Sequence, residues 1–316
     1  MENVSELIAF GPVPSRRLGQ SLGINNIPPK SCSYSCIYCQ VGRTQDITIG
    51  RKEFYQVDEI LRKVGGKISK ARDKGETINH LTFVTDGEPT LDINLGREIE
   101  MLKPFGIKIA VITNASLVWE ESVKDDLCRA DWVSVKIDAV SEDIWRKVNR
   151  SHKSLKLDNI LRGISEFSNM FKGTLATETM LVQGVNDGEE EIKRIADFIS
   201  GLKSPKSYVS IPTRPPAEKE VTPPDVNSIN RAYQLFAKKN IDTEYLIGYE
   251  GNAFAFTGDV KRDLLSITSV HPMKEEAVVK FLNKARANWE IVESLIKKGE
   301  LLKVRYRHQN FYVRKI

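Results

Sequence analysis

The segment Cys32-Ser-Tyr-Ser-Cys36-Ile-Tyr-Cys39 places three of the chain's four cysteines in one short loop, with the spacing C-x3-C-x2-C. A disulfide between such close neighbours would be strained, and clustered thiols in an intracellular protein more often bind metal. One loop of this length can wrap three thiolates around a single compact centre. A structural zinc site or a closed iron–sulfur cubane takes four ligands, so three cysteines leave one metal position open to a substrate or cofactor.

A zinc knuckle or a purely structural cluster is the alternative, and it needs a fourth ligand. Cys128 and the four histidines are all far from the loop in sequence, and none of them forms a second Cys/His pair. Cys128 is expected to be a small buried side chain on a helix. The predicted metal ligands are therefore Cys32, Cys36 and Cys39.

Downstream of this loop, short apolar and β-branched runs alternate with longer amphipathic stretches that have helical spacing. The runs cover residues 80–85, 108–113, 132–137, 175–182, 208–211 and 244–247. This alternation predicts βαβ units on a parallel sheet, as either a closed or partly open barrel or a doubly wound sheet. In each of these folds, ligands bind at the carboxyl ends of the strands.

A second motif, Asp86-Gly87-Glu88-Pro89, follows the first of these runs directly. Small residues at this place allow backbone oxygens to approach a ligand, and a carboxylate such as that of Glu88 suits a positive charge. The alternative interpretation is a β-turn that happens to contain a proline.

The cysteine spacing, with Tyr38 directly before the last cysteine, together with the second motif resembles the radical S-adenosylmethionine superfamily. The corresponding family segment is Gly-Gly-Glu-Pro, so Asp86 stands where the family has its first glycine. The resemblance implies an α/β fold, a partial (β/α)6 TIM-like barrel with a [4Fe–4S] cluster. The open iron would bind S-adenosylmethionine, and reductive cleavage would give a 5′-deoxyadenosyl radical. The electron would come from a reductant such as flavodoxin or ferredoxin.

The resemblance also implies contacts to S-adenosylmethionine at the strand ends. The expected cofactor-binding residues are Tyr38, Asp86, Gly87, Glu88, Pro89, Asn114, Ser134, Lys136, Asp138 and Asn186. Alternation along a strand places Ser134, Lys136 and Asp138 on one face, where they would line the barrel cavity. For Asn186, a plain strand-to-helix cap is the competing interpretation.

The segments 11–19 and 25–30 are rich in turn formers and basic residues. They resemble the leader of a branch grouped with the wyosine-base-forming tRNA enzymes. Arg16, Arg17, Lys30 and Arg214 are the expected substrate-binding residues. The archaeal wyosine enzymes carry extra cysteines upstream of the main loop, whereas this chain has none before Cys32. The resemblance therefore transfers the radical machinery and not the substrate.

The C-terminal part of the chain has a different pattern and a different charge. Residues 261–316 hold 13 basic and 6 acidic side chains, whereas the whole chain has a net charge of +5. Three short helical stretches followed by two strand-like runs predict a small winged-helix-like domain. We expect a barrel domain at 1–260 and this basic domain at 261–316, with an anionic partner as one use of its charge.

The chain has 316 residues, 41% of them apolar, with an acidic start and no run long enough to cross a bilayer. We expect a cytoplasmic protein with no membrane partner. The leading functional hypothesis is a radical enzyme that modifies a macromolecule, with tRNA as the first candidate. The second is a radical enzyme that modifies a protein or peptide or activates a glycyl radical enzyme. The third is a DNA-binding regulator that uses the cluster as a redox sensor.

Overall fold

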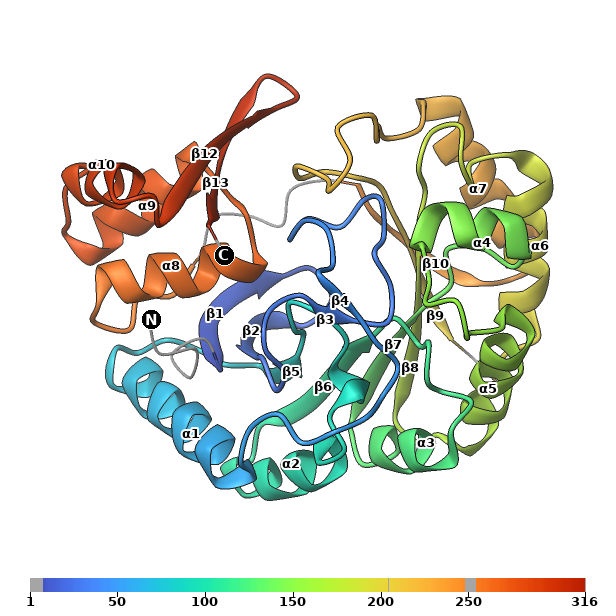
Figure 1. Ribbon diagram of the computed structural model, residues 1–316, viewed down its shortest axis with the longest axis horizontal. Helices are drawn as coiled ribbons and strands as arrows, with labels where there is room; N and C mark the ends of the chain where they lie inside the picture. Colours follow the sequence, from blue (N-terminus) through green and yellow to red (C-terminus); the bar gives the residue numbers. More distant parts are fainter. Residues whose placement is uncertain (1–7, 204, 248–253, 316) are drawn as a thin grey trace.

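The computed structural model describes residues 8–203, 205–247 and 254–315, and its centre is one curved sheet of eight strands (Figure 1). The sheet order is β1, β2, β5, β6, β7, β8, β9, β10. Only the β1–β2 pair is antiparallel; all other neighbours run parallel. The strands are β1 Ala9–Ser15, β2 Gly19–Ile24, β5 His80–Phe83, β6 Lys108–Thr113, β7 Trp132–Lys136, β8 Thr174–Met180, β9 Lys206–Ser210 and β10 Asp242–Leu246.

Helices α1 to α7 surround the outer face of this sheet (Figure 1). They are α1 Val57–Asp73, α2 Leu95–Leu102, α3 Glu121–Leu127, α4 Glu142–Asn149, α5 Leu157–Met170, α6 Glu189–Ser200 and α7 Val226–Lys238. Side chains alternate between the two faces of each strand. In β7, Val133 and Val135 join the large core under the helices, whereas Trp132 joins a small apolar cluster inside the curve of the sheet. The result is the partial barrel that the sequence predicts.

The six predicted strands are all present, but the N-terminal segment differs from the expectation of a turn-rich leader. It forms β1 and β2, and β2 is the first parallel strand of the barrel. Packing from distant parts of the chain explains this. The Phe10 ring lies against Gly23, where an added Cβ would come within 2.0 Å of the ring. Phe10 and Val13 also join the core of the C-terminal unit.

That C-terminal unit contains α8 Val260–Val270, β11 Met273–Lys274, α9 Glu275–Ala285, α10 Glu290–Lys297, β12 Leu301–Tyr306 and β13 Gln309–Arg314. Its sheet has the order β11, β13, β12. Arg307 and His308 form the two-residue turn of the terminal hairpin, and both have positive φ (47° and 63°), as a type I′ turn requires. Along the chain this unit therefore runs from one helix through a short strand and two further helices to the terminal hairpin.

Helix α8 is buried on nearly all sides, between β1 and the rest of the C-terminal unit. Its serine and threonine hydroxyls are satisfied within the helix. Thr268 Oγ1 donates to the Leu264 carbonyl at 2.7 Å, and Ser269 Oγ donates to the Ser266 carbonyl at 2.8 Å. Burial therefore leaves these polar groups paired. In the ranges that the structure describes, no helix has the length and apolar character needed to cross a membrane.

One buried ion pair joins α1 of the barrel to α8. Lys67 Nζ lies 2.6 Å from Asp263 Oδ1 and 3.0 Å from Thr257 Oγ1. The Asp263 carboxylate also accepts from the Thr257 backbone N–H at 2.7 Å. Burial lowers the pKa of Lys67, and the charge of Asp263 opposes that shift. Each charge is therefore compensated mainly by the other across the junction.

We expect Lys67→Met to lower the free energy of unfolding by about 3 kcal/mol, because it leaves the buried Asp263 carboxylate without its cation. Urea denaturation of the full chain measures the change. Lys70→Met, on the exposed face of the same helix, is the matched control, and it should change stability by less than about 0.5 kcal/mol. Equal losses in the two variants would contradict a joining role for the pair.

Candidate functional site

A cavity of about 290 Å³ lies at the carboxyl ends of the parallel strands. The side chains of Cys32, Cys36 and Cys39 all line it, and so does the turn at residues 86–88. Residues at the ends of five strands complete the wall: Thr113, Lys136, Met180, Ser210 and Leu246. The two motifs that stand about fifty residues apart in sequence therefore face one another across a single cavity.

The cysteine loop is held by the end of helix α4. The backbone N–H of Ser35 donates to the Asn149 carbonyl, and that of Ile37 donates to the Val148 carbonyl, each at 3.0 Å. The last carbonyls of a helix have no partner within the helix. The loop amides supply these partners, so the loop caps the helix and the helix fixes the loop.

Two asparagine side chains donate to the thiol sulfurs. Asn149 Nδ2 lies 3.3 Å from Cys36 Sγ, and Asn114 Nδ2 lies 3.5 Å from Cys32 Sγ. Burial, with the nearby Asp138 charge, raises the pKa of Cys36 to about 12. Burial also raises the pKa of Cys32 and of Cys39. In the metal-free protein the thiols are therefore protonated, and a metal centre must displace these protons when it binds.

The donor set fits an iron–sulfur cluster better than a single ion. Among the described residues, no group of three Cys, His, Asp or Glu side chains is arranged to hold one metal ion. In a cubane each thiolate binds a different iron, so its cysteines stand around a cavity instead of converging on a point. Three thiols around one cavity, two of them accepting N–H bonds, match this requirement.

The turn at residues 86–88 is locked by contacts that only these residue types allow. A Cβ added to Gly87 would lie 1.9 Å from the Ser31 carbonyl oxygen, so this position must be glycine. The Glu88 carboxylate accepts from Thr90 and Thr113 hydroxyls at 2.7 and 2.6 Å and from the Asn114 N–H at 2.7 Å. Glu88 thus fixes the turn and the end of β6, and its oxygens are already engaged.

Asp86 is the less satisfied carboxylate of this turn. It is buried, and neither of its carboxylate oxygens accepts a hydrogen bond within the part of the chain that the structure describes. Lys30 Nζ lies 3.6 Å away. Burial raises the pKa of Asp86 to about 7, and Lys30 opposes the shift. Buried acceptors without donors favour a ligand that brings a positive charge or N–H groups into the cavity.

Glu178 is not among the predicted site residues, yet it is central to the inner wall. Its carboxylate pairs with Arg17 and with Lys136, whose Nζ lies 3.0 Å away, and accepts from Ser210 Oγ at 3.1 Å. Burial alone would raise the pKa of Glu178, but the charges of Lys136 and Arg17 outweigh burial and lower the pKa to about 2. Its position two residues from Ala176 on the inner face of β8 was the available signal.

Most of the predicted site residues line this cavity, and five do not. The residues that line it are Cys32, Cys36, Cys39, Tyr38, Asp86, Gly87, Glu88, Asn114, Lys136, Arg17, Lys30 and Arg214. The residues outside it are Arg16, Pro89, Ser134, Asp138 and Asn186. Arg16 is exposed, and Pro89 begins the short 3-10 helix Pro89–Leu91 behind the turn. Ser134 is fully buried one layer deeper in the barrel than Lys136.

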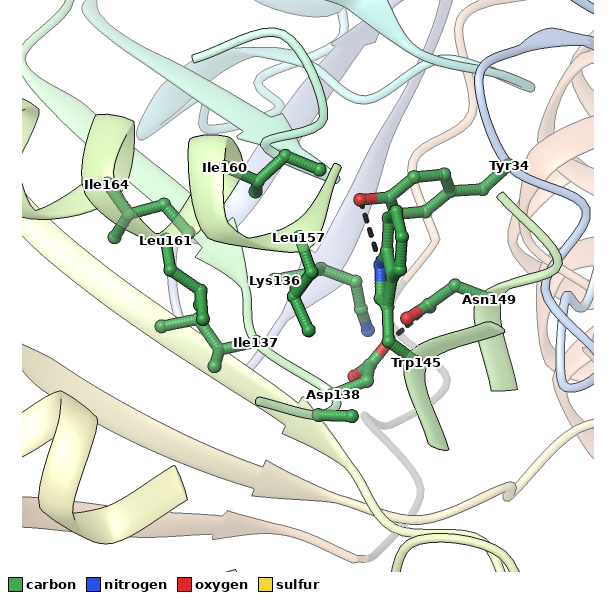
Figure 2. Close-up of a pocket in the computed structure, with 11 residues that line it drawn as sticks. Tyr34, Lys136, Ile137, Asp138, Trp145, Asn149, Leu157, Ile160, Leu161 and Ile164 are labelled. Atoms are coloured by element: carbon green, nitrogen blue, oxygen red, sulfur yellow. Dashed lines mark hydrogen bonds between the residues drawn. The ribbon is translucent and has the colours of Figure 1, made fainter. Parts of the chain in front are cut away.

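Of Ser134, Lys136 and Asp138, which were expected to line the cavity together, only Lys136 lines it. Strand β7 ends at Lys136, and Asp138 follows two residues later, where backbone and side-chain donors occupy its carboxylate. Asp138 accepts from the Tyr38 hydroxyl, from Asn149 Nδ2 at 2.8 Å and from the Met180 N–H at 2.9 Å. Figure 2 shows Asp138 and Asn149 facing one another beside a hollow of about 10 Å³, which is too small for a cofactor.

Two further residues support this arrangement from behind. Asn186 accepts from the Val182 N–H at 2.7 Å and donates to the carbonyls of Asp138 and Met180, each at 2.8 Å. It thus holds the loop after β8 against the segment after β7. The Trp145 ring meets Tyr34 edge-on, with centroids 5.9 Å apart, and its Nε1 donates to the Tyr34 hydroxyl at 3.2 Å (Figure 2).

Comparison with known proteins agrees with this geometry. The sequence profile of the Radical SAM superfamily matches residues 26–199. The UPF0026 protein MJ1312 of Methanocaldococcus jannaschii is 48% identical over 312 residues, which cover 98% of this chain and 96% of that protein. A radical SAM methyltransferase from Sphaerobacter thermophilus is similar in fold, with a TM-score of 0.57 at 19% identity over 72% of this chain and 66% of that one. The structure of TYW1 with a lysine-pyruvate adduct bound has a TM-score of 0.50 at 16% identity, and the match covers 69% of this chain and 73% of that one.

The buried Glu178 gives a pH-dependent prediction. Its pKa in the folded protein lies below the ordinary value of 4.5, so its charge adds stability that is fully present above pH 4.5 and is lost as the pH falls toward 2. We expect Glu178→Gln to lower the free energy of unfolding by about 3 kcal/mol at pH 7. Denaturation at several pH values should show this loss shrinking below pH 4.5. Glu244→Gln, at an exposed glutamate of β10, should have little effect at any pH; a pH-independent loss in Glu178→Gln would refute the assignment.

Proposed function

Because the chain belongs to the radical SAM superfamily, within it to the UPF0026 family, we propose that it cleaves S-adenosylmethionine at a [4Fe–4S] cluster held by Cys32, Cys36 and Cys39, in order to modify a macromolecule. Enzymes of this superfamily use that cluster and S-adenosylmethionine, and they need a one-electron reductant, for which flavodoxin or ferredoxin is our candidate. The observation that carries the proposal is the single cavity lined by all three cysteines and by the turn at residues 86–88.

When bound, the cluster supplies the electron that breaks the sulfonium bond of S-adenosylmethionine. The residues of this chain bind, orient and balance charge around that chemistry. Three thiolates would leave one iron of the cluster without a protein ligand, and S-adenosylmethionine would bind there through its amino and carboxylate groups. The unsatisfied oxygens of Asp86 suit the ammonium group, and Gly87 keeps the backbone close to it.

The cationic residues of the cavity suit the negative groups of a cofactor or substrate. Lys136 and Arg17 are held in place by Glu178, and Lys30 lies beside Asp86. Arg214 projects from the loop after β9 and contacts Gln40 at 2.7 Å. These positions support an assignment of Lys136 to a carboxylate or phosphate and of Arg17, Lys30 and Arg214 to the substrate.

A macromolecular substrate is favoured by the C-terminal unit. It carries the positive excess of the chain, and it touches the cavity rim, because Val270 lines the cavity and Gln40 Nε2 donates to the Val270 carbonyl at 2.9 Å. We propose that residues 261–316 form a docking domain of winged-helix type that packs on β1, and RNA is the first candidate for its partner. A peptide substrate is the second, since an exposed hairpin can also dock peptides. The redox-sensor hypothesis gives no role to the charged cavity wall, so we place it last.

The first experiment tests the cleavage reaction. Under anaerobic conditions, protein reconstituted with iron and sulfide and then reduced should convert S-adenosylmethionine to 5′-deoxyadenosine, measured by mass spectrometry. Cys36→Ala should abolish the product, because only two protein thiolates would remain to hold the cluster. Cys128→Ala is the matched control and should keep full activity. Normal cleavage by Cys36→Ala would disprove the ligand assignment, and an intact, reducible cluster without cleavage would favour the sensor hypothesis.

A second experiment tests the surroundings of the cluster. The Asn149 amide donates to Cys36 Sγ. Hydrogen bonds to cluster sulfurs stabilise the reduced cluster, which carries more negative charge, and therefore raise its midpoint potential. We therefore expect Asn149→Ala to shift the midpoint potential of the cluster to a more negative value, measured by a redox titration followed by EPR. Asn169→Ala, at an exposed asparagine of α5, should leave the potential unchanged. An unchanged potential in Asn149→Ala with a full complement of iron would contradict this role.

A further inference from the structure

A second hollow, also of about 290 Å³, lies beside the cluster cavity, and we call it the wing groove. On one side the terminal hairpin β12–β13 lines it with Tyr306, Arg307 and Gln309. On the other side Thr213, from the loop after β9, and Ile247, just after β10, line it. Thr213 also lines the cluster cavity. The two hollows therefore adjoin at Thr213, which lines both of them.

The walls of the wing groove are fixed to the rim of the cluster cavity. The Tyr306 hydroxyl donates to the Pro212 carbonyl at 3.0 Å, and Pro212 lines the cluster cavity. A second connection runs from the C-terminal unit to Gln40, the residue directly after Cys39. Arg214 Nη1 donates to Gln40 Oε1 at 2.7 Å. Whatever binds in the groove is thus held at a defined place relative to the cysteine loop.

The chemistry of the groove suits one nucleotide. Among the residues that the structure describes, two cations line it, Arg307 and Lys274, and no acidic side chain does. Tyr306 adds an aromatic ring, and Gln309 and Thr213 add polar groups. Its volume is at the lower end of small-molecule pockets, roughly 300 Å³. An aromatic ring can stack on a base, and cations can hold the flanking phosphates. Amide and hydroxyl groups can bond the 2′-hydroxyl that distinguishes RNA from DNA.

We infer that the wing groove docks an unpaired nucleotide of an RNA substrate and thereby places a neighbouring nucleotide at the cluster cavity. This inference deepens the proposed function and rests on it for the reaction, but binding itself requires no cleavage chemistry. Arg307 lies at the exposed tip of the hairpin, where it can reach the backbone of an incoming strand. Tyr306 lies one residue further in, between that tip and Pro212.

The test measures binding of fluorescein-labelled oligo(rU) to the full, cluster-loaded protein by fluorescence anisotropy at several salt concentrations. We expect affinity to fall as salt rises and oligo(dU) to bind more weakly. Tyr306→Ala should weaken binding of oligo(rU) roughly tenfold through lost stacking. In a plot of log affinity against log salt, Arg307→Gln should reduce the steepness of the negative slope by about one.

Lys280→Gln, at an exposed lysine of α9, removes the same charge elsewhere in the unit and should leave the affinity unchanged. Thermal melting checks that each variant is folded. If Tyr306→Ala does not fold, Arg307→Gln still tests the inference. Equal binding of oligo(rU) and oligo(dU), equal competition by oligo-glutamate, or equal effects of Arg307→Gln and Lys280→Gln would overturn the inference. If the unaltered protein does not bind oligo(rU) but forms 5′-deoxyadenosine normally, the groove is rejected and the proposed function stands. If it binds oligo(rU) but forms no 5′-deoxyadenosine, the proposed function alone is rejected.

Discussion

The contact on which the site depends is the one between the end of helix α4 and the cysteine loop. Amides of the loop satisfy helix carbonyls that would otherwise be unpaired, and the Asn149 side chain reaches from the same helix end to Cys36 Sγ. A loop with three cysteines and no regular structure of its own would lose much conformational entropy on binding a metal. Here the helix already holds the loop in place, so the fold sets the positions of the cysteines before a metal binds.

Charge is distributed through the cavity in compensated pairs. Glu178 is held between Lys136 and Arg17, and Asp86 lies beside Lys30. The two carboxylates differ in how fully neighbouring cations compensate their charge. Glu178 gains enough from its two cations that its pKa falls to about 2 in spite of burial, whereas Asp86 has one more distant cation and its pKa rises to about 7. The Glu178 carboxylate is therefore fully engaged in holding the cavity wall together, whereas the Asp86 carboxylate can still accept hydrogen bonds from a ligand.

The sequence predicts the barrel strands and the cysteine loop because both are local patterns. Apolar runs at a regular spacing identify six strands, and three cysteines in one loop need no knowledge of the fold. Predictions fail where a distant partner decides. Strand β1 is stabilised by Phe10 lying over Gly23 and against α8. Glu178 acquires its role from Arg17, which is 161 residues away. Asp138 does not line the cavity, because its carboxylate is occupied by Tyr38, Asn149 and the backbone N–H of Met180.

Strand β1 also packs into the core of the C-terminal unit. Phe10 and Val13 belong to the same core as Leu264 and Phe281, although about 250 residues separate them in the chain. A protein made from its N-terminus displays this apolar edge strand until α8 and its neighbours have been synthesised. An exposed edge of this kind invites pairing with other chains. The C-terminal unit therefore also covers strand β1, the edge of the barrel sheet, and a segment about 250 residues downstream ends the exposure of that strand.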